Sequence, residues 1–374
     1  MPPLARRNLF HDKVRLAVTV TGIVFAVVLI VVELGLFVGF TETTSGLVDN
    51  SNADLWITSK HVPYVELGVP FSERKLYQAR AVPGVADAQK MIAHWTQWKR
   101  PDGRNESVQI VGMNPDSRLE QPWNLVQGRV EDLKRPDAII LDDIYKDKLQ
   151  VTRVGEVFEL NGKRARVVGF THGIRSFTTS PYVFTTFKRA QEYAGIPDDQ
   201  TIFILVKLTP GADLETVRRG LLDHLTDVEV FTSKEFSRMT QIYWMFTTGA
   251  GVAVLLAAVL GLVVGFVVVA QTIYATTVDH LKEFGTLKAM GAPNSYVYKV
   301  ILTQATISAV IGYVFGMLVS GFVVRASQAG GAAILMPWPM AIGMFFLTLL
   351  MCTSAALVSI NKVTRLDPAM VFKG

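Results

Sequence analysis

The chain has 374 residues, half of them hydrophobic and 18% charged, and its formal net charge at pH 7 is +5. These averages combine two unlike parts, because residues 41–245 hold 26 of the 37 Lys and Arg and 27 of the 32 Asp and Glu. The basic excess therefore lies beside the apolar runs described next and not on a folded surface, which argues against a nucleic acid as a partner.

Four apolar runs are long enough to cross a membrane, a crossing that takes about 20 apolar residues. Glu33 is the only charged residue of the first run, Lys299 lies at the start of the third, and the second and fourth carry no charge. A cleaved signal peptide is the alternative for the first run, but about 25 apolar residues without a small-residue cleavage site favour a retained helix. The runs are residues 16–40, 246–275, 296–324 and 338–360.

Basic residues beside these runs predict the orientation, because cytoplasmic flanks are enriched in Lys and Arg. They precede the first run (Arg6, Arg7, Lys13, Arg15), separate the second from the third (Lys282, Lys288) and follow the fourth (Lys362, Arg365, Lys373). We therefore expect both termini and the connection between the second and third runs in the cytoplasm, and the segment after the first run on the other side of the membrane.

The predicted fold is a membrane protein of four transmembrane α-helices with a large mixed α/β extracytoplasmic domain inserted between the first and second. The inserted domain is expected over residues 41–232. The other expected segments are a cytoplasmic N-terminal segment (1–15), a stalk helix joined to the second span (233–275), a cytoplasmic helix (276–293), a short external loop (325–337) and a cytoplasmic tail (361–374).

Short alternating stretches with turn signals between them predict the mixed α/β content of the inserted domain, and two subdomains with a boundary near Pro197 fit this pattern. Asn161 and Gly162 predict a two-residue hairpin, because a type I′ turn needs φ > 0 at both positions. Cys352 is the only cysteine and lies in the fourth run, so the domain has no internal disulfide. Strands are expected at 53–58, 107–112, 138–141, 157–160, 164–169, 182–185, 202–208 and 228–231, and helices at 73–81, 188–194 and 213–224.

Residues 233–244 show helical periodicity and lead into the second run, which predicts one continuous helix from the domain into the membrane. Such a helix would carry motion between the two, or would only anchor the domain.

The segment between the second and third runs predicts a short amphipathic helix. Leu281, Phe284, Leu287 and Met290 recur every three residues. Gly291 is suited to end this helix, and a proline follows two residues later. The helix either lies in the lipid headgroups or presents its apolar ridge to a cytoplasmic partner.

The residues of this segment, Glu283-Phe284-Gly285-Thr286-Leu287-Lys288-Ala289-Met290-Gly291, resemble the E-x-G-x-L-[KR]-A-[LM]-G signature of ABC transporter permeases of the MacB, LolC/LolE and FtsX class, and most closely the DevC branch. Arg6-Arg7-Asn8-Leu9 near the start and Leu366-Asp367-Pro368-Ala369 near the end resemble the same family.

The resemblance implies a type VII, mechanotransmission permease whose coupling helix docks on a separate ABC-type ATPase. ATP and Mg²⁺ would bind to that ATPase, because this chain has no G-x-x-x-x-G-K-[ST] motif. We therefore expect no cofactor in this chain itself. The implied partners are a second permease copy, either identical or a paralogue, membrane lipids, a periplasmic adaptor and an outer-membrane channel. The docking residues carried over are Leu281, Glu283, Phe284, Gly285, Leu287, Lys288, Met290 and Gly291.

The implied activity is the export or extraction of a lipidic, peptide or amphiphilic cargo from the inner membrane or periplasm. Two alternatives stay open. One is an FtsX-like regulator of a periplasmic enzyme that transports nothing, and the other is a receptor or scaffold that works without ATP. No catalytic or metal-binding residues are expected, since the six histidines are dispersed and no nucleophile motif is present.

Other residues are candidates for packing or function. Three G-x-x-x-G pairs lie either between subunits or inside the protomer: Gly35 with Gly39, Gly261 with Gly265, and Gly312 with Gly316. Glu33 is an intramembrane charge, for which a structural role near the outer interface is favoured over a proton or substrate site. Trp95, Trp98 and Trp123 are expected in the core rather than on a contact surface.

Overall fold

The computed structural model describes residues 9–329 and 334–364. They form two compact units. The first, called the helix bundle, contains the described residues up to Gly39, Val252–Gln328 and those from Ile334 onward. The second, called the inserted domain, contains Phe40–Gly251.

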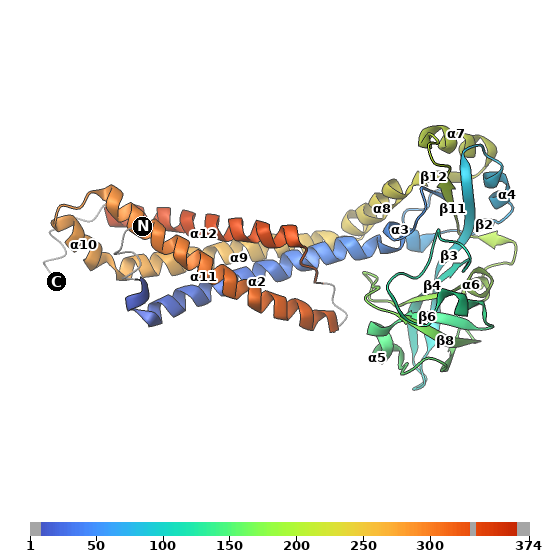
Figure 1. Cartoon of the computed structure of the whole chain (residues 1–374), viewed down its shortest axis with the longest axis horizontal. Helices are drawn as coiled ribbons and strands as arrows, with labels where there is room; N and C mark the ends of the chain where they lie inside the picture. Colours follow the sequence, from blue (N-terminus) through green and yellow to red (C-terminus); the bar gives the residue numbers. More distant parts are fainter. Residues whose placement is uncertain (1–8, 330–333, 365–374) are drawn as a thin grey trace. The chain divides into compact units, whose positions relative to one another are not determined.

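The helix bundle consists of long apolar helices that run side by side (Figure 1). Within the described residues, four helices are long and apolar enough to cross a membrane. They are α2 (Lys13–Thr44), α9 (Ala250–Asp279), α11 (Asn294–Ala329) and α12 (Trp338–Thr364). A short helix, α10 (Leu281–Ala289), lies between α9 and α11 in the chain and at one end of the bundle. The predicted fold class is confirmed for the membrane part.

Helix α2 packs closely against α9 and α11 through glycines on those two helices. A Cβ atom on Gly312 would lie 2.4 Å from Ile23 Cγ2, and one on Gly316 would lie 2.7 Å from Val27 Cβ. On α9, a Cβ on Gly265 would lie 2.9 Å from Ile30 Cδ1. Because glycine has no side chain, the helix backbones can approach each other closely at these points. Both glycine pairs of α9 and α11 therefore serve packing inside the protomer, which was one of the two predicted roles.

Gly35 has a different neighbour. A Cβ there would lie 2.7 Å from Ile334 Cγ2 and 2.9 Å from the Leu335 carbonyl oxygen. The Leu335 N–H also donates to the Gly35 carbonyl at 3.1 Å. This glycine thus makes room for the segment that precedes α12. Gly39, its predicted pair, is buried.

We predict that Gly312→Leu destabilises the helix bundle by about 1–3 kcal/mol, because the added side chain enters a filled contact with Ile23. The matched control is Gly321→Leu on the same helix, where an added Cβ meets nothing within 4 Å. The measurement is the thermal unfolding midpoint of the purified chain in detergent. Equal midpoints for the two variants would contradict the packing role.

The inserted domain is built on one large mixed sheet. Its strands run in the order β12-β1-β11-β3-β4-β9-β6-β8-β5, and β7 pairs with β3 and β8. The described strands of this sheet are β1 (Leu55–Ser59), β3 (Val85–Lys99), β4 (Asn105–Met113), β5 (Leu125–Gln127), β6 (Ala138–Asp142), β7 (Val157–Leu160), β8 (Lys163–Thr171), β9 (Tyr182–Thr186), β11 (Phe203–Leu208) and β12 (Val228–Thr232). A separate pair joins β2 (Phe71–Ser72) to β10 (Gln200–Thr201).

All eight predicted strands are present, with each end within two residues of its expected position. The Asn161-Gly162 hairpin is also present between β7 and β8, with φ of 46° and 75°. The longest strand, β3, was missed. It pairs with β11 up to Met91 and with β4 from Ile92 onward, so it joins two parts of the sheet. The chain therefore passes from the part of the sheet that contains β11 to the part that contains β4 within β3. The predicted boundary near Pro197 is not the only connection between the two parts.

Helices cover the sheet on more than one side. The first face of β1 buries Leu55 and Ile57 with residues of α4 (Lys75–Arg80) and α7 (Leu214–His224). The alternate residue Trp56 packs on the other face against Phe203 and Phe236, the last from α8 (Ser233–Ile242). This alternation is the normal consequence of strand geometry. The remaining helices are α3 (Gly46–Asp49), α5 (Lys146–Leu149) and α6 (Phe187–Ala194).

The predicted continuous helix from 233 into the second span is wrong. Helix α8 ends at Ile242, and a π-helical turn, η4 (Tyr243–Thr247), follows it. Gly249 then adopts a left-handed conformation with φ of 75°, and α9 begins at Ala250. A helix cannot continue through a residue with this φ, so the glycine interrupts the segment.

Asp142, at the end of β6, organises the loop after β8. Its buried carboxylate accepts hydrogen bonds from the N–H of Gly173 at 3.1 Å, the N–H of Ile174 at 2.7 Å and the hydroxyl of Thr171 at 2.9 Å. It also accepts from the Ile144 N–H at 3.2 Å. One side chain therefore satisfies four donors, of which the Thr171 hydroxyl and the Ile174 N–H are buried.

We predict that Asp142→Ala lowers the unfolding free energy of the inserted domain by about 3 kcal/mol, because it leaves the buried Ile174 N–H unsatisfied and removes the hydrogen bond from the buried Thr171 hydroxyl. Asp223→Ala changes an exposed carboxylate of α7 and should be neutral. Thermal unfolding of the full chain, followed by limited proteolysis of the domain, measures both. If Asp142→Ala becomes susceptible to the protease at the same temperature as the wild type, the loop keeps its structure without this carboxylate.

Candidate functional site

Helix α10 carries the predicted coupling residues, and its C-terminus has a complete hydrogen-bonded cap. The Gly291 N–H donates to the Lys288 carbonyl at 3.0 Å, and the Ala292 N–H donates to the Leu287 carbonyl at 3.0 Å. Gly291 has φ of 89°. These are the two bonds of a Schellman motif, and the left-handed residue that it requires is the predicted glycine. The end of α10 is therefore fixed by its own sequence.

The apolar side of α10 faces the bundle. Phe284 is 1% exposed and belongs to the hydrophobic core that α2, α9, α11 and α12 share, and half-buried Leu287 packs against that core. Gly285 is buried and Lys288 is half-buried. The expectation that the whole ridge is presented to a partner is therefore wrong for Phe284. The side chain of Leu281, the first member of the ridge, lies outside the described side chains.

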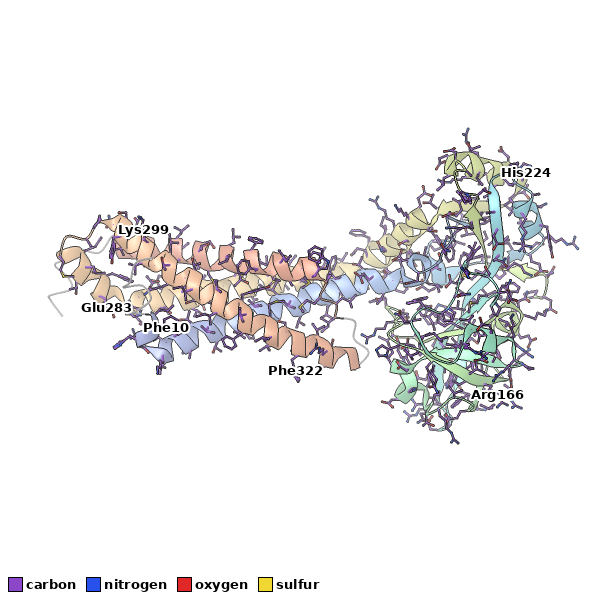
Figure 2. All side chains as sticks on the ribbon, viewed as in Figure 1. Phe10, Arg166, His224, Glu283, Lys299 and Phe322 are labelled. Atoms are coloured by element: carbon purple, nitrogen blue, oxygen red, sulfur yellow. The ribbon has the colours of Figure 1, made fainter. Side chains whose placement is uncertain are left out.

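The opposite side of α10 is exposed. Met290 is 72% exposed, and the Glu283 side chain is 51% exposed. The Glu283 carboxylate lies 3.0 Å from Nδ1 of His280, the residue that precedes the helix. Glu283 and exposed Lys299 of α11 both lie at this end of the bundle (Figure 2). A surface with polar, charged and apolar groups is thus available there, called the α10 surface: Glu283, Thr286, Met290 and Gly291.

Polar contacts connect the helices that meet near α10. The hydroxyls of Thr19 on α2 and Thr276 on α9 lie 2.9 Å apart. Arg15 of α2 lies 3.8 Å from the carboxylate of Asp279, the last residue of α9, and 3.1 Å from that of Asp12. These contacts hold the start of α2 beside the segment that leads into α10.

Glu33 lies on α2 where that helix meets α9. A Cβ on Gly261 would lie 2.8 Å from Glu33 Cγ, so the glycine makes room for the stem of this side chain. Within the part of the chain that the structure describes, its carboxylate has no hydrogen-bond or ion-pair partner. The contact with Gly261 gives Glu33 a packing role, and a proton or substrate role stays a hypothesis.

The three tryptophans singled out from the sequence belong to the inserted domain and are covered to different extents. Trp98 is fully buried, and its indole N–H donates to the Leu149 carbonyl at 3.2 Å. Half-buried Trp123 packs edge-on against Phe184, with ring centroids 5.9 Å apart. Trp95 is half-buried. Among the described residues, no group of three or more His, Cys, Asp or Glu could hold a metal ion.

A second group, missed in the sequence, lies in the inserted domain at the turn η4. Tyr64 stacks on Tyr243 with ring centroids 4.2 Å apart, and Trp244 packs edge-on against Tyr64 at 5.5 Å and Phe177 at 5.3 Å. Phe40 adds an edge-on contact to Phe177 at 4.3 Å. These residues are called the aromatic cluster. It joins the end of α2, two loops and η4.

The inserted domain has two buried carboxyl groups with raised pKa values, and one of them contacts this cluster. Glu66, in the short helix η1 (Val65–Leu67), is 5% exposed, and burial raises its pKa to about 7. The indole N–H of Trp244 lies 3.5 Å from Glu66 Oε2 and favours the ionised form, but less strongly than burial disfavours it. Glu120 is also buried, which raises its pKa well above the usual range.

Tyr182 of β9 connects these two carboxyl groups electrostatically. Burial is the main cause that raises its pKa well above the usual range, and the charges of Glu66, Tyr145 and Glu120 add to it. The side-chain polar atoms of Tyr182 and Glu120 are buried without partners in the described residues. Only the apolar neighbours of Glu66 in the sequence Tyr64-Val65-Glu66-Leu67 could have indicated a buried acid.

Family models match both units of the chain. The MacB-like periplasmic core domain matches residues 16–223, and the FtsX-like permease C-terminal matches residues 255–368. An uncharacterized ABC transporter permease of Mycobacterium tuberculosis is 24% identical over 99% of this chain and 99% of its own length. One from Mycobacterium bovis is 25% identical with the same coverage of both chains.

Solved structures give weaker likenesses to the inserted domain. The periplasmic region of MacB from Actinobacillus actinomycetemcomitans aligns with a TM-score of 0.38 and 11% identity, over 50% of this chain and 92% of that one. The extracellular domain of the transporter YknZ from Gram-positive bacteria aligns with a TM-score of 0.36 and 14% identity, over 48% and 98%.

The match of the first family model to more than half of the sequence and that of the second to its C-terminal part identify the family. The chain belongs to the ABC transporter permeases with a MacB-like periplasmic core domain and an FtsX-like C-terminal region, and it is a multi-pass membrane protein.

Proposed function

We propose that this permease receives motion from a separate ABC-type ATPase at the α10 surface and passes it through the helix bundle to the inserted domain. The observation that carries the proposal is the position of Phe284. Because this side chain is buried in the bundle core while Glu283 and Met290 are exposed, a partner that moves α10 must also move the helices packed around Phe284.

The charges beside the spans support a membrane orientation for this proposal. Basic flanks favour α10 and both termini in the cytoplasm and the inserted domain on the periplasmic side of a bacterial inner membrane. An ATPase in the cytoplasm would then meet the α10 surface directly. The exposed pair of a carboxylate and a thioether suits a groove with an apolar floor and a basic rim.

The cargo class is lipidic, peptide or amphiphilic, taken from the inner membrane or periplasm. This proposal rests on the resemblance to the MacB, LolC/LolE and FtsX class. The same resemblance supports three proposed partners, which are a second permease copy, an adaptor and an outer-membrane channel, and it supports assignment to the DevC branch. Exposed apolar side chains along α9, such as Leu256, Leu260 and Val263, offer surface for lipid or for a second copy.

Reconstituted vesicles separate transport from regulation. The full chain and its ATPase are placed in vesicles that contain a fluorescent lipopeptide, with an acceptor protein outside. ATP-dependent transfer of the probe to the acceptor supports the export proposal. ATP-dependent activation of a hydrolase added outside, without transfer, would replace it by the regulatory alternative.

We predict that Glu283→Lys and Met290→Asp each lower co-purification of the ATPase at least about tenfold, which corresponds to about 1.4 kcal/mol of lost binding energy. Both changes are on the exposed side of α10 and should leave the bundle folded. The partner is first identified by mass spectrometry after pull-down with the wild-type chain, and its recovery with each variant is then quantified.

The matched control for these variants is Glu131→Lys, an exposed charge reversal in the inserted domain. It should leave ATPase recovery unchanged. Full recovery with both α10 variants would remove the docking assignment.

A further inference from the structure

Glu66 connects a loop of the inserted domain to the π-helical turn η4. Its carboxyl group is buried, and the Trp244 indole N–H, which belongs to η4, lies 3.5 Å from Oε2. The next turn of chain beyond η4 leads into α9, the second long apolar helix. The contact therefore lies at the point in the chain where the inserted domain ends.

The aromatic cluster packs the same loop on the same turn. Tyr64, two residues before Glu66, stacks on Tyr243, and Trp244 packs on both Tyr64 and Phe177. Aromatic pairs of this kind contribute through apolar burial and favourable ring geometry. Trp244 of this cluster also contacts Glu66 Oε2 through its indole N–H, so the packing of the loop and the protonation of this buried carboxyl group are linked.

In the described part of the chain, the titratable groups that face Glu66 do not supply a positive charge. They are Tyr64 on its own loop and Tyr182 on β9, and Tyr64 in turn faces Tyr243 on η4. Tyr182 in turn faces Glu120 and Tyr145, and Tyr145 faces Asp142 and Arg175. Among the described residues, only a backbone N–H and the Trp244 indole favour the ionised form of Glu66.

Within the part of the chain that the structure describes, an ionised Glu66 would therefore be a buried charge without a counter-ion. The cost of such a charge is large, and a protein relieves it by protonation or by exposing the group to water. The loop that carries Glu66 is short, and its neighbour Leu67 is already half exposed to solvent. Release of the loop from η4 is the direct route by which an ionised Glu66 reaches water.

We propose that Glu66 is a proton-dependent latch: in its protonated form it holds residues 64–67 against η4, and in its ionised form it leaves the aromatic cluster and loosens this turn. The latch concerns the inserted domain alone. It does not rest on ATPase docking, and its test contains no ATPase.

The direction of the pH dependence follows from the two states. In the closed state the pKa of Glu66 is about 7, and in water the ordinary value is 4.5. Between these values the closed state binds more protons than the open state, so closure is fully favoured below about pH 4.5 and weakens as the pH rises. The closing equilibrium changes by up to about 300-fold across this interval, tenfold for each pH unit.

Hydrogen exchange of the full chain in detergent tests the latch. Peptides that cover residues 62–68 and 240–248 are followed by mass spectrometry at pH 5.5 and 8.5, with labelling times scaled for intrinsic exchange. We expect the wild type to lose protection in both peptides at pH 8.5. Glu66→Gln cannot ionise and keeps an acceptor for the indole, so its protection should be the same at both pH values. Glu131→Gln, an exposed control, should behave as the wild type.

A second variant keeps the test decisive if Glu66→Gln does not fold. Trp244→Phe keeps an aromatic ring and removes the N–H that favours ionised Glu66. It should therefore move the midpoint of the protection loss to higher pH. Equal protection of the wild type at both pH values would overturn the proposal, as would an unshifted midpoint in Trp244→Phe or a retained pH dependence in Glu66→Gln.

Discussion

The close approach of α2 to α9 and α11 is the interaction on which the membrane part depends. Lipid tails are as apolar as the side chains of these helices, so burial of apolar surface gives little reason for helices to associate in a membrane. Association then relies on close packing. Gly265 on α9 and Gly312 and Gly316 on α11 leave the space that Ile30, Ile23 and Val27 of α2 fill. The same packed core includes Phe284, so the short helix α10 is held by the contacts that hold the bundle.

Local signals in the sequence predicted much of this architecture. Long apolar runs correspond to the four membrane helices, Asn161-Gly162 forms its hairpin, and Gly291 ends α10 in the left-handed conformation. Each of these features depends on a few adjacent residues. Strand β3 was missed because Val85–Lys99 mixes Ala, Asp, Gln and Lys with apolar residues and lacks a clear alternation. It is a strand because it has a partner on each side, which is a non-local cause.

The sequence predicted where α10 lies in the chain, but not which side of this helix packs against the bundle. A three-residue period identifies an amphipathic helix, but it does not say whether the apolar side meets a partner or the rest of the same chain. Phe284 meets its own bundle. Glu66 and Glu120 were not predictable, because their burial results from the packing of distant segments. The interruption of the segment after α8 depends on Gly249, whose φ is decided by its surroundings and not by its identity alone.

Strand β3 has a consequence for how the inserted domain is assembled. One half pairs with β11 and the other with β4, so the register of a single strand is shared by both parts of the sheet. A slip by one residue would turn every side chain of β3 to the opposite face and would disrupt the packing of both parts together. Both parts therefore depend on one orientation of β3, and a one-residue insertion between Met91 and Ile92 would turn the side chains of one half to the opposite face relative to the other half.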